Sequence, residues 1–167
     1  MRLDSLKKLY IQELRDLYSA ENQIVKAFPK MVKAANAPEL QEAFQSHLGE
    51  TKNHVTRLTT VFQNLGVSPK GKSCKGMEGL LAEGAELMDE DADPEVLDAG
   101  LIAAAQRVEH YEMAGYGTVR TYARLLRDSE AEELLQEPLD EEGNADKKVT
   151  DIAEHVVNAE AAAREKT

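Results

Sequence analysis

The chain is poor in the residues that stabilise secreted or aromatic-rich domains. Cys74 is the single cysteine among 167 residues, so no disulfide can form within the chain, and nothing indicates an oxidising compartment. Tryptophan is absent and aromatic residues make up only 5%. Hydrophobic residues still reach 42%, which excludes disorder by composition and suits one domain with a sizeable core.

Long apolar runs and positive charge are also scarce. No run is long enough to span a bilayer, and residues 1–5 lack the apolar region of a signal peptide. The formal net charge is −11, from 20 Lys and Arg against 31 Asp and Glu. Such a surface repels the phosphates of nucleic acids and of anionic membranes, and suits a soluble protein or one that attracts cations. We therefore expect a cytoplasmic protein whose partners are neither nucleic acid nor membrane.

Apolar residues recur with helical spacing along four long stretches of the chain. These stretches cover residues 3–35, 38–65, 93–127 and 129–163, and a shorter helix is expected over residues 77–89. Asp4 or Ser5 can cap the first helix, and Gly66 is placed to end the second. Local bends or distortions are expected at Pro29, Pro138 and Gly143.

The lengths of the connections predict how the helices are arranged. Short turns join the first helix to the second and the third to the fourth, so each pair is antiparallel. The connection over residues 66–93, about 28 residues, is long enough to cross the bundle. The sequence therefore predicts an all-α protein with a single ferritin-like domain over residues 1–167: a four-helix bundle with one long crossover that contains a short fifth helix. A coiled coil is not supported, because sustained heptads with charged flanks are missing.

Each long helix carries acidic or histidine side chains on its apolar stripe. Neighbouring candidates within a helix are spaced i, i+3 or i, i+4 and so point the same way. The candidate metal ligands are Glu21, Glu50, His54, Glu109, Glu112, Glu142 and Asp146. A carboxylate on an apolar face must be paired, protonated or bound to a metal, and one such residue alone is more often bonded to water or arginine.

These side chains all fall near the middle of their helices, and the midpoints of antiparallel helices share one level. A layer of six carboxylates is strongly unfavourable without cations, whereas two divalent ions would balance about four of the charges. The oxygen-rich set favours Fe or Mn over Zn. The sequence thus predicts a two-metal site, with solvated acids on a helical scaffold as the alternative.

Three further polar residues near these candidates are assigned lesser roles. His47 shares the face of Glu50 and is expected to be exposed or simply hydrogen-bonded, with support of a metal ligand as the alternative. His110 and Glu141 are rotated away from the apolar stripes and are expected to lie outside the site.

Four segments around these residues resemble a known family. They are Tyr18-Ser-Ala-Glu21, His47-Leu-Gly-Glu50-Thr, Leu101-Ile-Ala-Ala-Ala-Gln-Arg-Val-Glu-His-Tyr-Glu112 and Leu139-Asp-Glu-Glu142. They are similar to the YciE/YciF family of bacterial stress proteins, which are ferritin-like and related to rubrerythrins, and the resemblance covers about residues 4–159. It implies a cytoplasmic stress-associated protein with a five-helix fold, a homodimer and a di-iron centre, and it implies no established reaction.

The resemblance also assigns roles to the candidates. By similarity to rubrerythrins, the carboxylate ligands are Glu21, Glu50, Glu109, Glu112 and Glu142, and His54 and Asp146 take the positions of histidines. Asp146 therefore departs from the family pattern. The chain lacks the cysteine pairs of a rubredoxin-like site, so it has no built-in electron donor of that kind, and the donor stays unknown.

A di-metal centre supports two functions, between which the sequence does not decide. An oxidoreductase acting on peroxide or oxygen would use two metals bridged by Glu50 and Glu142. Tyr18, Tyr111 or Tyr116 would then be a nearby proton or electron donor, unless it only fills the core. The other function is a non-enzymatic one, in which the protein stores or buffers metal or the metal stabilises a dimer.

The crossover residues bear on the oligomeric state. Met77, Leu80, Leu81 and Leu87 are apolar and have no obvious place inside a four-helix core. They either cover the open side of the bundle or pack against a second copy, and a closed twofold homodimer is the expected assembly.

Overall fold

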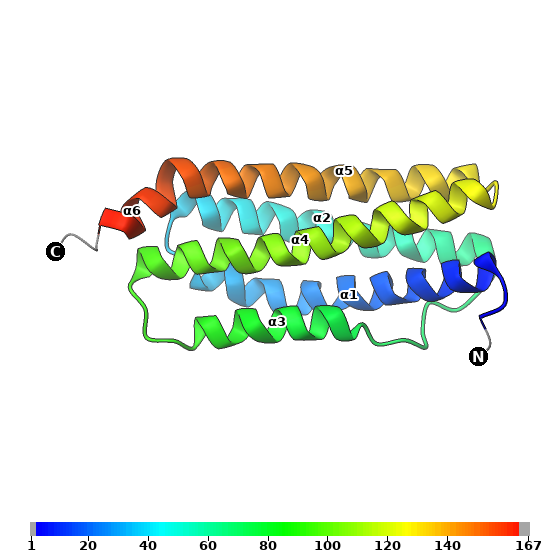
Figure 1. The fold of residues 1–167 in the computed structure, drawn as a ribbon, viewed down its shortest axis with the longest axis horizontal. Helices are drawn as coiled ribbons and strands as arrows, with labels where there is room; N and C mark the ends of the chain where they lie inside the picture. The colour runs from blue at the N-terminus through cyan, green and yellow to red at the C-terminus, as the bar shows by residue number, and fades with distance from the viewer. Residues whose placement is uncertain (1–2, 164–167) are drawn as a thin grey trace.

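The computed structural model describes residues 3–163, and the regular elements in that range are all helical (Figure 1). They are α1 (Leu6–Ala34), α2 (Pro38–Leu65), α3 (Lys75–Met88), α4 (Pro94–Leu125), α5 (Ser129–Ile152), a π-helical turn (Ala153–Val157) and α6 (Asn158–Ala163). The predicted all-α fold is confirmed. Within residues 3–163, no helix combines the length and the apolar character needed to cross a membrane.

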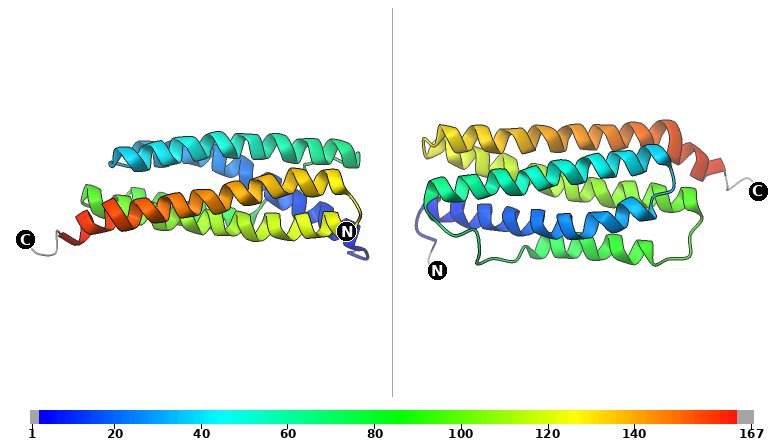
Figure 2. Two further views of the ribbon diagram at one scale, coloured as in Figure 1. Left: turned by 90° about the horizontal axis from the view of Figure 1, so that it is seen from above. Right: turned by 180° about the vertical axis from the view of Figure 1, so that it is seen from behind.

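Four long helices form the bundle, and the crossover carries the shorter α3 along its outside (Figures 1 and 2). α1 contacts α2 and α4, and α5 contacts α2 and α4, which closes a ring of four helices. The segment 66–93 leaves α2 at one end of the bundle and joins α4 at the other end (Figure 1). This is the predicted order of two antiparallel pairs joined by one long crossover.

The helix ends follow from local capping chemistry. The hydroxyl of Ser5 accepts a hydrogen bond from the amide three residues ahead, as does the carboxylate of Asp128 at the start of α5. Gly66 ends α2 with φ 65°, a left-handed conformation that glycine adopts without a Cβ clash. The third long helix ends two residues earlier than predicted, at Leu125, because Arg127 takes φ 61° in the turn that follows.

The last predicted helix is divided, although not where the sequence suggested. The helices continue through Pro29, Pro138 and Gly143. The α-helical hydrogen bonding changes instead at the π-helical turn, which inserts one extra residue into the helix. Ala153 and Val157 are both buried, so the turn keeps apolar side chains directed at the bundle.

α3 covers the side of the bundle formed by α1 and α4. Met77 is fully buried, and Leu80, Leu81 and Leu87 are partly buried against the core. The apolar side chains of the crossover therefore cover the bundle, which was one of the two alternatives for them.

Cys74 anchors the start of α3. Its sulfur accepts a hydrogen bond from the amide of Met77 at 3.4 Å, lies 3.0 Å from Asp16 Oδ2 and lies 2.9 Å from the hydroxyl of Tyr111. Tyr111 donates to the same oxygen of Asp16 at 2.6 Å. Burial alone would raise the pKa of Asp16, but the hydrogen bonds from Cys74, Tyr111 and Lys72 outweigh it and lower the pKa. The crossover is thus tied to α1 and α4 by a polar cluster as well as by apolar contacts.

The buried apolar side chains fall into two clusters along the bundle axis. One holds Ile24, Phe28, Phe44, Leu101, Val108 and Val149 among others; the second holds Tyr10, Leu14, Leu58, Tyr116 and Leu135 among others. Along each long helix, one cluster ends and the other begins close to the middle. Buried polar residues occupy the boundary between the clusters, namely Glu21, Thr51, His54, Glu109, Glu112 and Glu142.

Candidate metal centre

The polar layer takes one or two side chains from each long helix at the same level of the bundle. α1 contributes Glu21, α2 contributes His47 and His54, α4 contributes Glu109 and Glu112, and α5 contributes Glu142; all six are buried. The predicted convergence of acidic and histidine side chains at mid-bundle is therefore what the structure shows. The residues that make up the layer differ in part from the predicted ligands.

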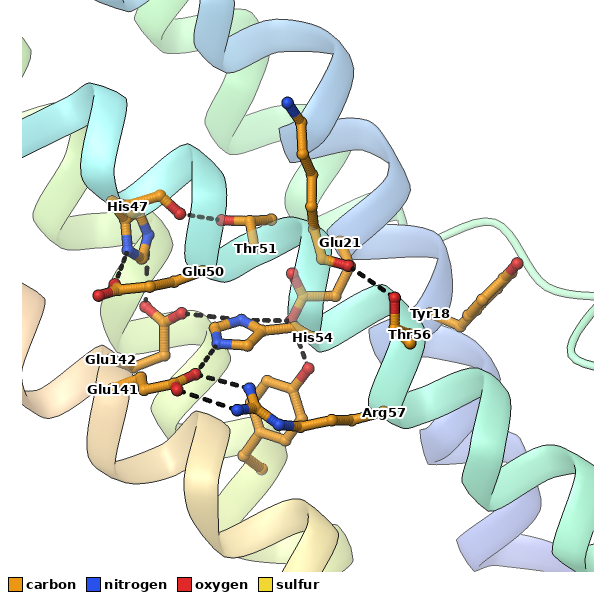
Figure 3. A network of polar contacts seen from close by, with 12 residues as sticks. Tyr18, Glu21, His47, Glu50, Thr51, His54, Thr56, Arg57, Glu141 and Glu142 are labelled. Carbon is orange, nitrogen blue, oxygen red and sulfur yellow. Dashed lines mark hydrogen bonds and ion pairs between the residues drawn. The ribbon is translucent and has the colours of Figure 1, made fainter.

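His54 lies at the centre of this layer (Figure 3). Its Nδ1 is 3.4 Å from Oε1 of Glu21 and 3.4 Å from Oε1 of Glu142. Its Nε2 donates to Glu141 Oε2 at 2.7 Å, since a carboxylate only accepts. Arg57 holds the carboxylate of Glu141 with two hydrogen bonds, at 2.8 Å and 3.1 Å. The neutral imidazole therefore presents the Nδ1 lone pair to the centre, as metal-binding histidines do when a carboxylate orients them.

The same contacts shift the pKa of His54. Burial alone would lower its pKa, but the neighbouring carboxylates of Glu21 and Glu141 outweigh burial and raise the pKa, which favours a positive charge at this position.

His47 is arranged in the same way from the other side (Figure 3). Its Nδ1 contacts Glu50 Oε2 at 3.3 Å, and its Nε2 lies 3.6 Å from Glu142 Oε2. Each oxygen of Glu142 thus faces one of the two histidines, His54 and His47. His47 is only 3% exposed, which rules out the exposed position among the alternatives expected for it and leaves the hydrogen-bonded one, here to Glu50.

Tyr116 adds a phenol to the layer. Its hydroxyl donates a hydrogen bond to Glu21 Oε1, and its ring meets the His54 ring edge to face at 5.8 Å. Burial, together with the charges of Glu21 and Glu112, raises the pKa of Tyr116, so the phenol keeps its proton.

Eight buried ligand atoms in this layer lack a hydrogen-bond partner. They are Oε2 of Glu21, Oε2 of Glu109, both carboxylate oxygens of Glu112, both of Glu142, Nε2 of His47 and Nδ1 of His54. Buried polar atoms are nearly always hydrogen-bonded, so a cluster of this size needs an explanation. A cation bound among these lone pairs would explain why the atoms lack hydrogen-bond partners.

The pKa values of the buried acids show the strain of this layer without a cation. Burial, reinforced by the charges of Asp146 and Glu50, raises the pKa of Glu109 to about 8. Burial and neighbouring carboxylates also raise the pKa values of Glu112 and Glu142 well above the usual range. Without a cation, the layer therefore favours the protonated form of these carboxyls.

The ligand atoms form two groups that share one residue. Glu21, His54 and Glu112 bring one atom each to within 4.8 Å of one another, and so do His47, Glu112 and Glu142. Carboxylate oxygens with one imidazole in each group are a donor set that suits Fe or Mn. The residues therefore fit two neighbouring divalent ions, with Glu112 able to contact both.

Two of the predicted ligands lie beside these groups. The Glu50 side chain is 38% exposed and is bonded to His47, and the residue that the two groups share is Glu112. Asp146 is 22% exposed, and its Oδ1 accepts from Gln106 at 3.0 Å and contacts His110 at 3.1 Å.

The displacement of Glu50 follows from the rotation of α2 about its axis. On α2 the buried stripe runs through His47, Thr51 and His54, at i, i+4 and i+7, which leaves Glu50 on the flank. On α5, Asp146 keeps the spacing of the stripe through Glu142 and Val149, but its carboxylate is bonded to Gln106 and contacts His110, both on α4. The i, i+7 spacing of the two α2 histidines was the sequence signal that pointed to His47.

Glu141 is the other residue that spacing alone missed. It is rotated off the apolar stripe as predicted and does not enter either group of ligand atoms, yet its long side chain reaches back to His54 Nε2. Residue spacing gives no signal for such a contact, because it crosses from α5 to α2.

Comparison with known proteins agrees with this architecture. A family model described as "Domain of unknown function (DUF892)" matches residues 5–162. Protein YciF of Escherichia coli (strain K12) is 41% identical over 162 residues, 96% of this chain and 98% of that protein. The crystal structure of the E. coli stress protein YciF superposes with a TM-score of 0.90, covering 93% of this chain and 99% of that chain.

A more distant structure defines the wider fold. A ferritin-like, diiron-carboxylate protein from Bacillus anthracis str. Ames superposes with a TM-score of 0.68 over 91% of this chain and 99% of that chain. At 15% identity this likeness concerns the fold alone. The chain therefore belongs to the DUF892 family, is a relative of the stress protein YciF, and has a ferritin-like fold.

Proposed function

We propose that the chain binds two divalent ions, of iron or manganese, at the middle of the bundle. Glu21 and His54 hold one ion, His47 and Glu142 hold the other, and Glu112 contacts both. The observation that carries this proposal is the cluster of eight buried ligand atoms without hydrogen-bond partners, contributed by all four long helices. Two cations satisfy these lone pairs and replace the protons that the raised pKa values require.

The side chains around the centre orient the ligands. Glu141, held by Arg57, fixes the ring of His54 so that Nδ1 faces the ions, and Glu50 does the same for His47 Nδ1–H so that Nε2 faces them. Both ligand histidines are thereby fixed in one tautomer.

The activity that fits this centre best is handling of peroxide, oxygen or iron in a cytoplasmic, homodimeric stress protein. A ferrous pair supplies two electrons when bound, the number that converts one hydrogen peroxide and two protons into two waters. Tyr116, whose hydroxyl is bonded to Glu21, can hold a proton beside the centre. The description of the E. coli relative as a stress protein supports this class of function.

A second function is retention of metal without turnover. Its support is the enclosure of the ligands: Glu21, His54, Glu112 and Glu142 are all fully buried. A centre so enclosed suits slow release of its ions.

The test begins with protein purified without chelators and analysed for metals. We expect two ions per chain in the wild type and in the control Glu133→Gln, which alters an exposed acid on α5. Glu112→Gln removes the carboxylate shared by both groups and should weaken binding by about 100-fold or more. If anaerobic titration of the wild type shows no binding tighter than micromolar, the metal centre is refuted.

The two functions separate in one further measurement. Anaerobic, iron-loaded protein is mixed with hydrogen peroxide, and peroxide loss is followed together with iron oxidation. Consumption of one peroxide per ferrous pair supports the redox function. Full retention of ferrous iron with no loss of peroxide supports metal retention.

A further inference from the structure

A small cavity opens from the surface between α2, α4 and α5, next to one of the two groups of ligand atoms. Its volume is about 100 Å³. His47 and Glu109 line its buried end, and Glu50, Ala145 and Lys148 line its outer part. The cavity therefore connects solvent with the His47 side of the proposed centre.

The inner end of the cavity presents an unsatisfied carboxylate. Glu109 is 1% exposed, and its Oε2 has no hydrogen-bond partner. It belongs to neither of the two groups of three ligand atoms. A buried oxygen of this kind, lining a cavity, is suited to receive a cation that comes from outside.

The outer end presents a second carboxylate that solvent reaches. Glu50 is 38% exposed at its side chain, and its Oε2 is held by His47 Nδ1 at 3.3 Å. His47 in turn points Nε2 toward Glu142 in the centre. Glu50, Glu109 and His47 thus line one cavity, and His47 connects it with the second group through its contact with Glu142.

The cavity is large enough to hold water, and its lining offers carboxylate oxygens along the way. The oxygens of Glu50 and Glu109 are positioned to replace water on an ion that enters.

The ligands of the other half of the centre do not line this cavity. Glu21 and His54 are fully buried, and the Glu141–Arg57 pair closes the outer side of His54 (Figure 3). An ion can therefore reach the His54 group by way of the His47 group.

We propose that this cavity is the uptake route of the centre: a divalent cation is held by Glu50 and Glu109 on its way in, fills the His47 group first, and passes on to the His54 group. The proposal rests on the metal centre proposed above. It adds a transient cation site outside that centre and an order of filling.

The test measures uptake rate and equilibrium affinity separately, with Co²⁺ as the probe. Metal-free protein is mixed with Co²⁺ in a stopped-flow instrument and the absorption of the bound ion is followed, while equilibrium dialysis gives the dissociation constant. Ala145→Leu fills the cavity from a half-buried position and should slow uptake about tenfold, with the dissociation constant within about threefold of the wild type. Ala103→Leu, at an exposed alanine of α4, is the matched control and should bind at the wild-type rate.

Variants that change the charge at the outer part of the cavity give a second, independent measurement of the uptake rate. Glu50→Gln removes an attracting charge and should slow uptake about threefold, whereas Lys148→Gln removes a repelling charge from an exposed position and should speed it by about the same factor. Both effects should shrink at high salt. A purely structural role of these residues would not change the rate in opposite directions.

The outcomes distinguish the route from the centre. If the wild type binds two Co²⁺ and Ala145→Leu takes them up at the wild-type rate, the route is overturned and the centre stands. Equal shifts in the same direction for Glu50→Gln and Lys148→Gln would also overturn it. If the wild type binds no Co²⁺, the centre itself is refuted and the route with it.

Discussion

Raising the pH of the metal-free protein should destabilise it between about pH 5 and pH 8. The main reason is Glu109, whose pKa burial raises from 4.5 to about 8. A carboxyl whose folded pKa lies above its unfolded pKa contributes stability that is fully present below the unfolded value and is lost as the pH rises through the folded value. The raised pKa values of Glu112, Glu142 and His54 act in the same direction.

The size of the loss can be worked out from the Glu109 values. The difference between 4.5 and about 8, at about 1.4 kcal/mol for each pH unit, gives a ceiling of about 5 kcal/mol for Glu109 alone. The loss due to Glu109 should be about 2–5 kcal/mol, because water in the adjoining cavity can solvate part of the charge. Below about pH 4.5 the trend reverses, since the lowered pKa values of Asp16 and Glu50 make their stabilisation vanish as they take up protons.

The assay is urea unfolding of chelator-treated protein at pH 5 and pH 8, at one protein concentration. With a slope of about 2 kcal/mol per molar urea, the contribution of Glu109 should lower the midpoint by roughly 1–2.5 M between these pH values. Glu109→Gln should reduce this pH dependence by the contribution of Glu109, whereas the exposed control Glu133→Gln should keep it in full. Equal stability at the two pH values, or greater stability at pH 8, would refute the assignment of buried, protonated carboxyls to the metal-free state. Saturating divalent metal at pH 8 should restore stability, because ions replace the protons.

The remaining predictions concern residues around the centre and the crossover. Glu141→Gln keeps the shape of the side chain that orients His54 but removes its charge. Metal affinity should therefore fall by about 10- to 100-fold while the circular dichroism spectrum is unchanged. Unchanged affinity in equilibrium dialysis would contradict the orienting role of Glu141. Sedimentation equilibrium at tens of micromolar should give a dimer mass, and a wild-type monomer at that concentration would refute the dimer. Leu81→Asp on α3 should lower the urea midpoint, because Leu81 packs against the bundle; an unchanged midpoint would contradict its role as a cover. Cys74→Ala removes the sulfur that Asp16 and the start of α3 contact, and it should lower the free energy of unfolding in urea by about 1–2 kcal/mol. Cys74→Ser should lower it by less. Equal midpoints for the wild type and both variants would show that the sulfur contributes nothing to stability.

The sequence predicted the bundle well because its signals are local. Helical periodicity, the cap at Ser5 and the glycine at Gly66 determine where helices begin and end, and all three depend on residues close together in the chain. The length of the crossover then restricts the order of the helices. The π-helical turn after Ile152 was missed, because the Ala and Val residues that form it also suit an ordinary helix.

The site was predicted at the level of the layer, and less well at the level of single atoms. Midpoints of antiparallel helices share a level, so Glu21, Glu112 and Glu142 could be brought together from sequence alone. Which flank of α2 faces the centre depends on a modest rotation of the helix, which spacing does not determine, and this exchanged Glu50 for His47. Contacts such as that of Glu141 with His54 depend on the direction of a long side chain across two helices, and no pattern within one helix records it.

The division of the apolar core into two clusters has a consequence for where the protein opens. In most bundles the helix ends fray first and the middle exchanges its amide hydrogens most slowly. Here the middle turns of the long helices surround carboxyls rather than apolar side chains. Without metal, the backbone amides of this middle layer, the waist of the bundle, should therefore exchange faster than those of the apolar regions on either side. Two bound ions would join the two halves across the waist, and the amides near Glu21 and Glu142 would become among the slowest to exchange. The metal would then convert a bundle with two separately cohesive ends into one cooperative unit.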